Sequence, residues 1–239
     1  MRGIYTAGMG MLNSFAEMNT ISNNLANANT TAFKKDQNVF KAILDSQINV
    51  YNKNDLKGMK IGEINRGVVL DEVYTDFTQG ALVETLNPLD FAIEGKGFFK
   101  IQRGDEFFYT RNGEFKMNGE GYLVTNEGDY VLDKLDNPII ITENFSVYEN
   151  GNIAGTDLFL NIIDLNNYYK LGNNLFSGEE IINDNEFSIK QFFTESSNVN
   201  ALNEMVKMIQ AQRKFDILEK AVTTHDSLNA KIIEISSRG

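Results

Sequence analysis

The stretch ISNNLANANTTAFKKDQNVF, residues 21–40, ends one structural pattern and begins another. Its first residues continue an apolar stripe at helical spacing, but Asn23, Asn24, Asn27 and Asn29 follow almost side by side. Asparagine forms helices poorly because its amide competes for backbone hydrogen bonds. So much amide at the end of a regular stripe indicates side chains that bond across neighbouring helices or that cap the last turns.

Upstream of this stretch, apolar and small residues alternate spacings of three and four. This is a heptad pattern, and it predicts a helix over 4–28 whose apolar face needs a partner. Gly8 and Gly10 cost helical stability unless another chain segment approaches them closely. The seven stripe positions are Ile4, Ala7, Met11, Ser14, Met18, Ile21 and Leu25.

A second periodic run occupies the C-terminal end. Ser197 and Asn198 are candidate N-cap residues, and Glu204 lies early, where the helix dipole favours an acid. We expect a helix of about ten turns with a two-position slip in register between Ile209 and Leu218. The apolar positions are Leu202, Val206, Ile209, Leu218, Ala221, Val222, Leu228, Ile232 and Ile235.

The middle of the chain has a different pattern. Residues 91–142 contain short aromatic and β-branched runs separated by turn pairs, which predicts a meandering antiparallel sheet or a small barrel. Asn112-Gly113 is a signal for a type I′ hairpin turn. Residues 41–75 are polar and weakly periodic, and we expect an extended connection with some helix at its start.

These patterns predict an α+β fold. The N- and C-terminal helices, in residues 1–34 and 195–239, pair as a coiled-coil domain. An extended linker occupies 35–75, and a mainly antiparallel β domain occupies 76–194. Pattern alone leaves open whether the helices pack only on each other or also on neighbouring copies.

Composition excludes several function classes. The net charge of −11, from 33 acidic against 22 basic residues, argues against nucleic acid and anionic membranes as partners. No cysteine is present, so neither disulfides nor thiolate metal sites can form, and the single His225 fits a helical seam better than a catalytic base. We expect no metal, no cofactor and no enzyme activity. No window predicts a membrane-spanning helix or a cleaved signal peptide.

Two short motifs have ordinary explanations. Gly95-Lys96-Gly97 lacks the third glycine and the following helix of a dinucleotide fingerprint, so it indicates a turn. Arg103-Gly104-Asp105 spells an adhesion tripeptide at a place where a hairpin turn is expected. A secreted binding or adhesion module that uses this turn is the alternative function, and an extracellular hydrolase lacks any identifiable catalytic pair.

The segment ISNNLANANTTAFK at 21–34 resembles the signature of the flagellar rod and hook proteins, the axial components of the bacterial basal body. IYTAGMGM at 4–11, NPLDFAIEGKGFFKIQ with YTRNGEFKMNGEGYLVT, and ESSNVNALNEMVKMIQAQRKFDILEKAVTTHDSLNAKI at 195–232 resemble the same family in the same order. Ala32 stands where the family usually has glycine, which implies a shifted bend or some strain.

The resemblance implies a structural role in the flagellar basal body, in the proximal rod or else the distal rod. The terminal helices would line a tube of many copies, and the β domain would pack outside it. Implied partners are copies of the chain, other axial rod and hook proteins and the flagellar type III export apparatus. The expected assembly interface consists of Ile4, Ala7, Met11, Met18, Ile21, Asn23, Asn24, Leu25, Asn27, Leu202, Val206, Ile209, Leu218, Val222, Leu228 and Ile232.

Overall fold

The computed structural model describes residues 2–50, 59–142, 145–181 and 187–237. The chain divides into two compact units. One, here the helical unit, comprises Met1–Ala26, Asp36–Asp76 and Asn200–Gly239. The other, here the β unit, comprises Asn27–Lys35 and Phe77–Val199. The segment after the first helix and the segment before the last one therefore belong to the β unit, and not to the helical domain in which we expected them.

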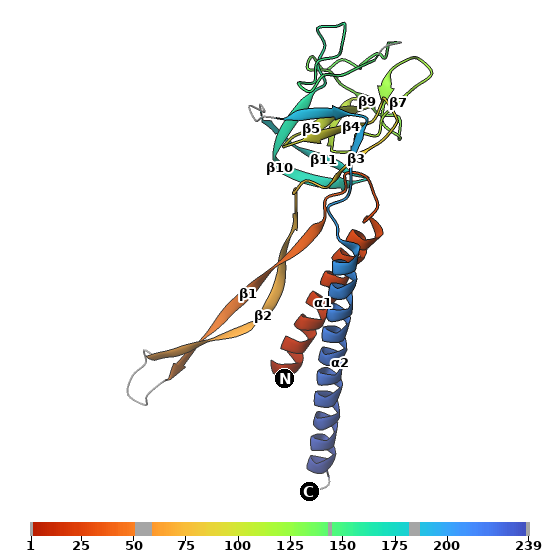
Figure 1. The fold of residues 1–239 in the computed structure, drawn as a ribbon. Helices are drawn as coiled ribbons and strands as arrows, with labels where there is room; N and C mark the ends of the chain where they lie inside the picture. Colours follow the sequence, from red (N-terminus) through yellow and green to blue (C-terminus); the bar gives the residue numbers. More distant parts are fainter. Residues whose placement is uncertain (1, 51–58, 143–144, 182–186, 238–239) are drawn as a thin grey trace. The chain divides into compact units, whose positions relative to one another are not determined.

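The helical unit contains two helices and one long β-hairpin (Figure 1). Helix α1 spans Arg2–Ala26 and helix α2 spans Ala201–Ser237, and they pack against each other along α1. Strand β1, Asp36–Val50, pairs antiparallel with β2, Met59–Thr75, from Asp36↔Thr75 to Val50↔Met59. The expectation of an extended connection with some helix is thus wrong for these residues, since both strands are paired. Their weak periodicity fits an isolated two-stranded ribbon, in which Val39, Val73 and Tyr74 are exposed.

The start of α2 differs from the expected one. The cap is Asn200, whose Oδ1 accepts a hydrogen bond from the backbone N of Asn203 at 3.0 Å. Asn198 instead accepts a bond from the backbone N of Lys35 at 2.8 Å, within the β unit. Neither Ser197 nor Asn198 is therefore the cap, and Asn198 is instead bonded to a residue distant in sequence.

The β unit holds eleven strands in its described residues, and four of them form a closed ring. β5 pairs with β6, β6 with β11, β11 with β10, and β10 returns to β5, all antiparallel. The expected meander or small barrel is confirmed. The bounds are β3 Leu82–Glu84, β4 Phe91–Glu94, β5 Phe98–Arg103, β6 Glu106–Thr110, β7 Lys116–Met117, β8 Leu123–Val124, β9 Tyr130–Val131, β10 Ile162–Gly172, β11 Leu175–Ile181, β12 Ser188–Gln191 and β13 Phe193–Glu195.

Two apolar clusters lie on opposite faces of this sheet. Adjacent residues of a strand point to opposite faces, so Phe99 belongs to the larger cluster and Phe98 to the smaller one. Phe98 packs against Phe176 and Phe77 with ring centroids 5.2 and 5.6 Å apart. Because both faces are covered, consecutive residues such as Phe98 and Phe99 of β5 are both buried, where a strand with one wet face would alternate.

The hairpin turn between β5 and β6 lies at Gly104-Asp105, and no hairpin turn forms at Asn112-Gly113. Arg103 pairs with Glu106 across a two-residue loop in which Gly104 has φ +63°. Neither Asn112 nor Gly113 has the positive φ that a type I′ turn needs, so that prediction is wrong. Gly113 serves close packing instead, because a Cβ there would lie 1.8 Å from the carbonyl oxygen of Phe91.

Candidate assembly surface

Small residues of α1 face α2. A Cβ on Gly10 would lie 3.0 Å from Cδ1 of Leu218, and a Cβ on Gly3 would lie 3.2 Å from Nε2 of His225. Ala7 and Ser14, spaced between and beyond these glycines, are buried. Gly10 therefore offsets its helix-breaking cost by letting α2 approach closely. Nothing lies within 4 Å of a Cβ built on Gly8, so this helix pair does not explain that glycine.

The side of α2 that faces α1 repeats every seven residues. Glu204 and Ala211 are buried and Leu218 is partly buried, while His225 lies opposite Gly3 at the seam position expected for it. Met208, Phe215 and Val222 lie between them and are partly buried, which completes one unbroken heptad seam. The expected two-position slip is therefore wrong. It arose because Leu202, Val206 and Ile209 belong to a different face. The seven-residue spacing is present in the sequence, but the seam positions include an acidic, a small and an aromatic residue, so an apolar pattern does not identify them.

The structure distributes the sixteen expected interface residues over three environments. Ala7, Ile21 and Asn24 are buried inside the single chain. The partly buried ones are Ile4, Met11, Met18, Leu25, Asn27, Leu218 and Val222. The exposed ones are Asn23, Leu202, Val206, Ile209, Leu228 and Ile232. The single chain thus brings the α1 stripe and the middle of α2 together and leaves both ends of α2 uncovered.

The hydrogen bonds of Asn24 give one reason for the asparagines at the end of α1. Its Oδ1 accepts a hydrogen bond from the backbone N of Asp36 at 2.9 Å, and its Nδ2 donates to the carbonyl of Asp36 at 2.8 Å. The same Nδ2 lies 3.4 Å from Oε2 of Glu204 on α2. One buried amide therefore joins α1, α2 and the start of β1. This is the register-setting role of an amide in a helical seam, directed here at the chain's own backbone.

Asn27 and Ala32 form the turn that follows α1. The carbonyl of Asn27 accepts a bond from the backbone N of Thr30 at 3.1 Å, and its Oδ1 accepts one from the Thr30 hydroxyl at 3.2 Å. Ala32 has φ +57° and is buried, and its N donates to the carbonyl of Glu195 at 2.6 Å. The bend is therefore kept, and Ala32 holds it under strain.

Replacing Ala32 with glycine is expected to stabilise the protein by about 0.5–1 kcal/mol. The left-handed conformation costs an L-residue roughly 1–2 kcal/mol, and glycine removes this cost. Glycine also has more conformational freedom in the unfolded chain, which favours unfolding and cancels part of the stabilisation. Thermal unfolding followed by circular dichroism should show a midpoint about 1–4 °C higher. Ala92→Gly is the matched control, since Ala92 is buried in β4 without a positive φ and should lose stability. A lower midpoint for Ala32→Gly would refute the strain.

A buried ionic cluster holds the same turn to the β unit. Glu195 Oε1 lies 2.6 Å from Nζ of Lys34, and its Oε2 lies 3.0 Å from Nη2 of Arg111; all three side chains are at most 5% exposed. Glu195 also accepts a bond from the backbone N of Gly80 at 2.9 Å. Lys34 further donates to the carbonyl of Thr78 at 2.9 Å. Sequence analysis missed this cluster because its members are separated by as many as 161 residues.

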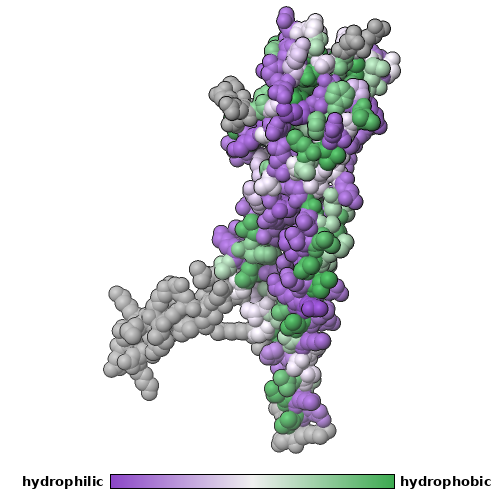
Figure 2. Space-filling view, in the orientation of Figure 1, coloured by the Kyte–Doolittle hydropathy of each residue, from purple (hydrophilic) through white to green (hydrophobic). Residues whose placement is uncertain are grey.

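A second apolar stripe of α2 lies on its outer surface. Ile209 and Val206 are 51% and 53% exposed, and Leu202 is 75% exposed. Near the C-terminal end Leu228, Ile232, Ile233 and Ile235 are also exposed, and Ile232, seven residues after His225, lies in line with the seam rather than with this stripe. Figure 2 shows green apolar groups along the helices, interrupted by purple polar ones. Clustered aliphatic side chains in water mark a surface that another molecule covers.

Three family models match successive parts of the chain. Residues 4–34 match the flagella basal body rod protein model, residues 92–155 match the D1 domain of the flagellar hook protein FlgE/F/G, and residues 190–235 match the C-terminal region of the flagellar basal body rod FlgEFG protein.

The flagellar basal-body rod protein FlgG of Borreliella burgdorferi is 32% identical over 95% of this chain and 96% of its own length. FlgG of Agrobacterium fabrum is 33% identical over 95% and 97%. The hook-basal body complex protein FlhO of Bacillus subtilis is 30% identical over 95% of both chains.

The chain belongs to the flagellar rod and hook protein family.

This rod-family protein is a structural component of the flagellar basal body, and the terminal helices are among the parts that the family models match. The names of these relatives give no position along the rod, so the choice between a proximal and a distal segment stays a prediction. None of the helices in the described part of the chain has the length and apolar character that crossing a bilayer requires.

The titratable side chains of the rod-family protein bear on the sites that the sequence suggested. Within the described residues, no three acidic or histidine side chains gather in a group that could hold a metal ion. The Arg103 guanidinium donates to both carboxylate oxygens of Asp129, at 2.8 and 2.6 Å. This bond raises the pKa of Arg103. The arginine of the adhesion-like tripeptide is therefore bound by an aspartate from another turn of the β unit, which disfavours the adhesion alternative.

Proposed function

We propose that this protein polymerises through its terminal helices, with copies of itself and with other axial proteins, into the tube that transmits torque and conducts exported subunits. The observation that carries the proposal is the outer stripe of α2, apolar and uncovered in a single chain. The polymer itself would supply the missing cover. We infer no catalysis, and a purely structural role accounts for the residues described above.

The energetics of this stripe favour a many-neighbour assembly over isolated pairs. Burying a half-exposed aliphatic side chain contributes roughly 1 kcal/mol. Leu202, Val206 and Ile209 of the stripe, together with the exposed Leu228 and Ile232 further along α2, would then contribute roughly 5 kcal/mol. Immobilising one free copy costs about 4–15 kcal/mol. A copy that touches one neighbour is therefore held weakly, and a copy that touches several is held firmly. Growth at the end of an existing tube follows from this difference.

The export route is part of the proposal. The family resemblance implies passage through the flagellar type III apparatus in an unfolded or nearly unfolded form. A chain without cysteine suits that route, because no disulfide can lock a partly folded state before export. No disulfide has to form after export either. Weak pairwise association also suits it, because subunits awaiting export would stay apart.

Quantitative mass spectrometry of purified hook–basal bodies from the source bacterium tests the proposal. We expect the protein in stoichiometric amounts relative to the hook protein, since a structural subunit is counted in copies per rod. The ratio would also decide between a short proximal segment and a longer distal one. Absence from clean basal bodies, with the protein free in the medium, would contradict a structural role and favour the binding-module alternative.

A further inference from the structure

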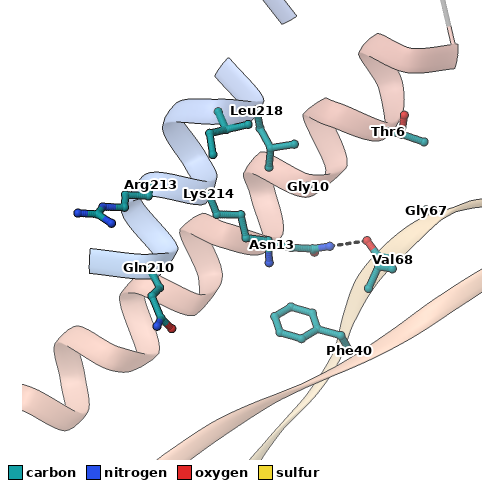
Figure 3. Close-up of a pocket in the computed structure, with 11 residues that line it drawn as sticks. Thr6, Gly10, Asn13, Phe40, Gly67, Val68, Gln210, Arg213, Lys214 and Leu218 are labelled. Atoms are coloured by element: carbon teal, nitrogen blue, oxygen red, sulfur yellow. Dashed lines mark hydrogen bonds between the residues drawn. The ribbon is translucent and has the colours of Figure 1, made fainter. Parts of the chain in front are cut away.

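The helical unit contains an open groove between its helices and its hairpin (Figure 3). The cavity measures about 650 Å³. Phe40 of β1 and Val68 of β2 line one side, and Ile217 and Leu218 of α2 line the other. Between these walls, Asn13 of α1 donates from Nδ2 to the carbonyl of Val68. The groove is therefore mainly apolar, and a hydrogen bond between α1 and β2 helps to fix its shape.

Helix α2 extends well beyond its partner. Gly3, at the beginning of α1, lies opposite His225. The residues from Asp226 to Ser237 continue as helix for roughly 18 Å, at 1.5 Å per residue. We call this segment the overhang. Leu228, Ile232 and Ile235 lie on one side of it, at spacings of four and three, and are 51%, 63% and 73% exposed.

The overhang cannot enter the groove of its own chain. One wall of that groove is Gln210–Leu218, which belongs to the same continuous helix. Leu228 stands roughly 15 Å along the helix axis from Leu218. No glycine or proline interrupts α2 between these positions, so the helix has no point at which to fold back. Any overhang that fills the groove must come from another copy.

We propose that the overhang of one copy occupies the groove of the next copy. The proposal rests on the proposed polymerisation and specifies its contact. The apolar side chains of the overhang match the apolar walls of the groove.

The contact explains why the assembly grows as an open polymer. The groove and the overhang are different surfaces, so each copy uses one of them and leaves the other free for a further copy. Such a heterologous contact gives a ring if its rotation closes and a helical filament if it does not. The centre of the groove, near Lys214, and the centre of the overhang, near Ile232, are roughly 27 Å apart along α2. Adjacent contacting copies should be displaced by about that distance along the helix axis.

Cysteine crosslinking in assembled rods tests this contact, because the natural chain contains no cysteine. Val68→Cys is combined in turn with Leu228→Cys, Ile232→Cys and Ile235→Cys, each pair in a single chain. After oxidation, at least one pair should give a ladder of dimers and higher multiples on a non-reducing gel, since a disulfide needs Cα atoms within about 7 Å. Each single variant, and Leu86→Cys with Ile232→Cys, should give no ladder. Leu86 is 97% exposed and lies in the β unit.

Two results would overturn the proposal and leave polymerisation intact. One is normal incorporation of all three pairs without a ladder. The other is a cryo-electron microscopy map of wild-type rods in which the overhang contacts something other than a neighbour's groove. That map uses the unmodified chain and decides the question even if a cysteine pair fails to assemble. Absence of the wild-type chain from basal bodies would instead contradict the proposed function itself.

Discussion

Replacing Ile209 with aspartate is expected to abolish incorporation into the rod while the isolated chain still folds. Ile209 is 51% exposed in a single copy, so a carboxylate there remains in water. In the proposed polymer the same position is covered by a neighbour, and an unpaired buried charge costs several kcal/mol. That cost is comparable to the whole contribution of the stripe, and every added subunit would incur it. Leu25, which is partly buried within the chain, is a less clean site for this test.

The measurement combines folding and assembly. Circular dichroism of purified Ile209→Asp should match the natural chain, whereas basal bodies from cells that carry only this variant should lack it and the cells should not swim. Gln212→Asp is the matched control: it introduces the same residue one turn along α2, at an exposed position that is already polar, and should assemble normally. If cells that carry only Ile209→Asp swim and their rods contain the variant, the outer stripe is not the interface.

Replacing Glu195 with alanine is expected to destabilise the β unit by about 3–5 kcal/mol. Glu195 is 1% exposed and pairs with both Lys34 and Arg111. Its removal leaves two buried cations without their anion, and breaking a buried pair typically costs this much. Arg111 would still donate to the carbonyls of Gly95 and Gly97, which neutralise no charge. The backbone N of Gly80 would also lose its acceptor.

Urea unfolding of the full chain measures this loss. Glu195→Gln keeps an acceptor for the surrounding donors and should fall between alanine and the natural residue. Glu84→Ala is the control for removing a carboxylate, because Glu84 lies exposed on β3, whose partner strand β13 contains Glu195. It should change stability by no more than about 0.5 kcal/mol. If Glu195→Ala behaves like Glu84→Ala, the cluster does not hold the turn after α1.

Local pattern and family resemblance predicted several parts of this protein correctly. The heptad spacing from Ile4 to Leu25 is set by 3.6 residues per turn, a property of each segment by itself, and it placed α1 within two residues at either end. The same holds for the length of α2 and for the aromatic and β-branched runs that became β4, β5 and β6. The motifs at both ends and in the middle predicted the family that the comparisons show.

Other features depended on partners distant in sequence. Period alone could not decide which face of α2 turns inward, because α1 with its small residues selected the seam of Glu204, Ala211 and Leu218 over the more apolar stripe of Ile209. Residues 36–50 and 59–75 have little alternation, and they form strands because they pair with each other.

The sequence by itself therefore determined the two terminal helices, the strands β4, β5 and β6, and the family to which the chain belongs. Only the tertiary structure decided which faces of these segments pack against each other. It also brought Lys34 to Glu195, and it placed the carbonyl of Phe91 so close to Gly113 that no side chain fits there. The physical reason is that helix and strand periods arise from bonds between near neighbours, whereas burial and charge pairing depend on side chains brought together from opposite ends of the chain.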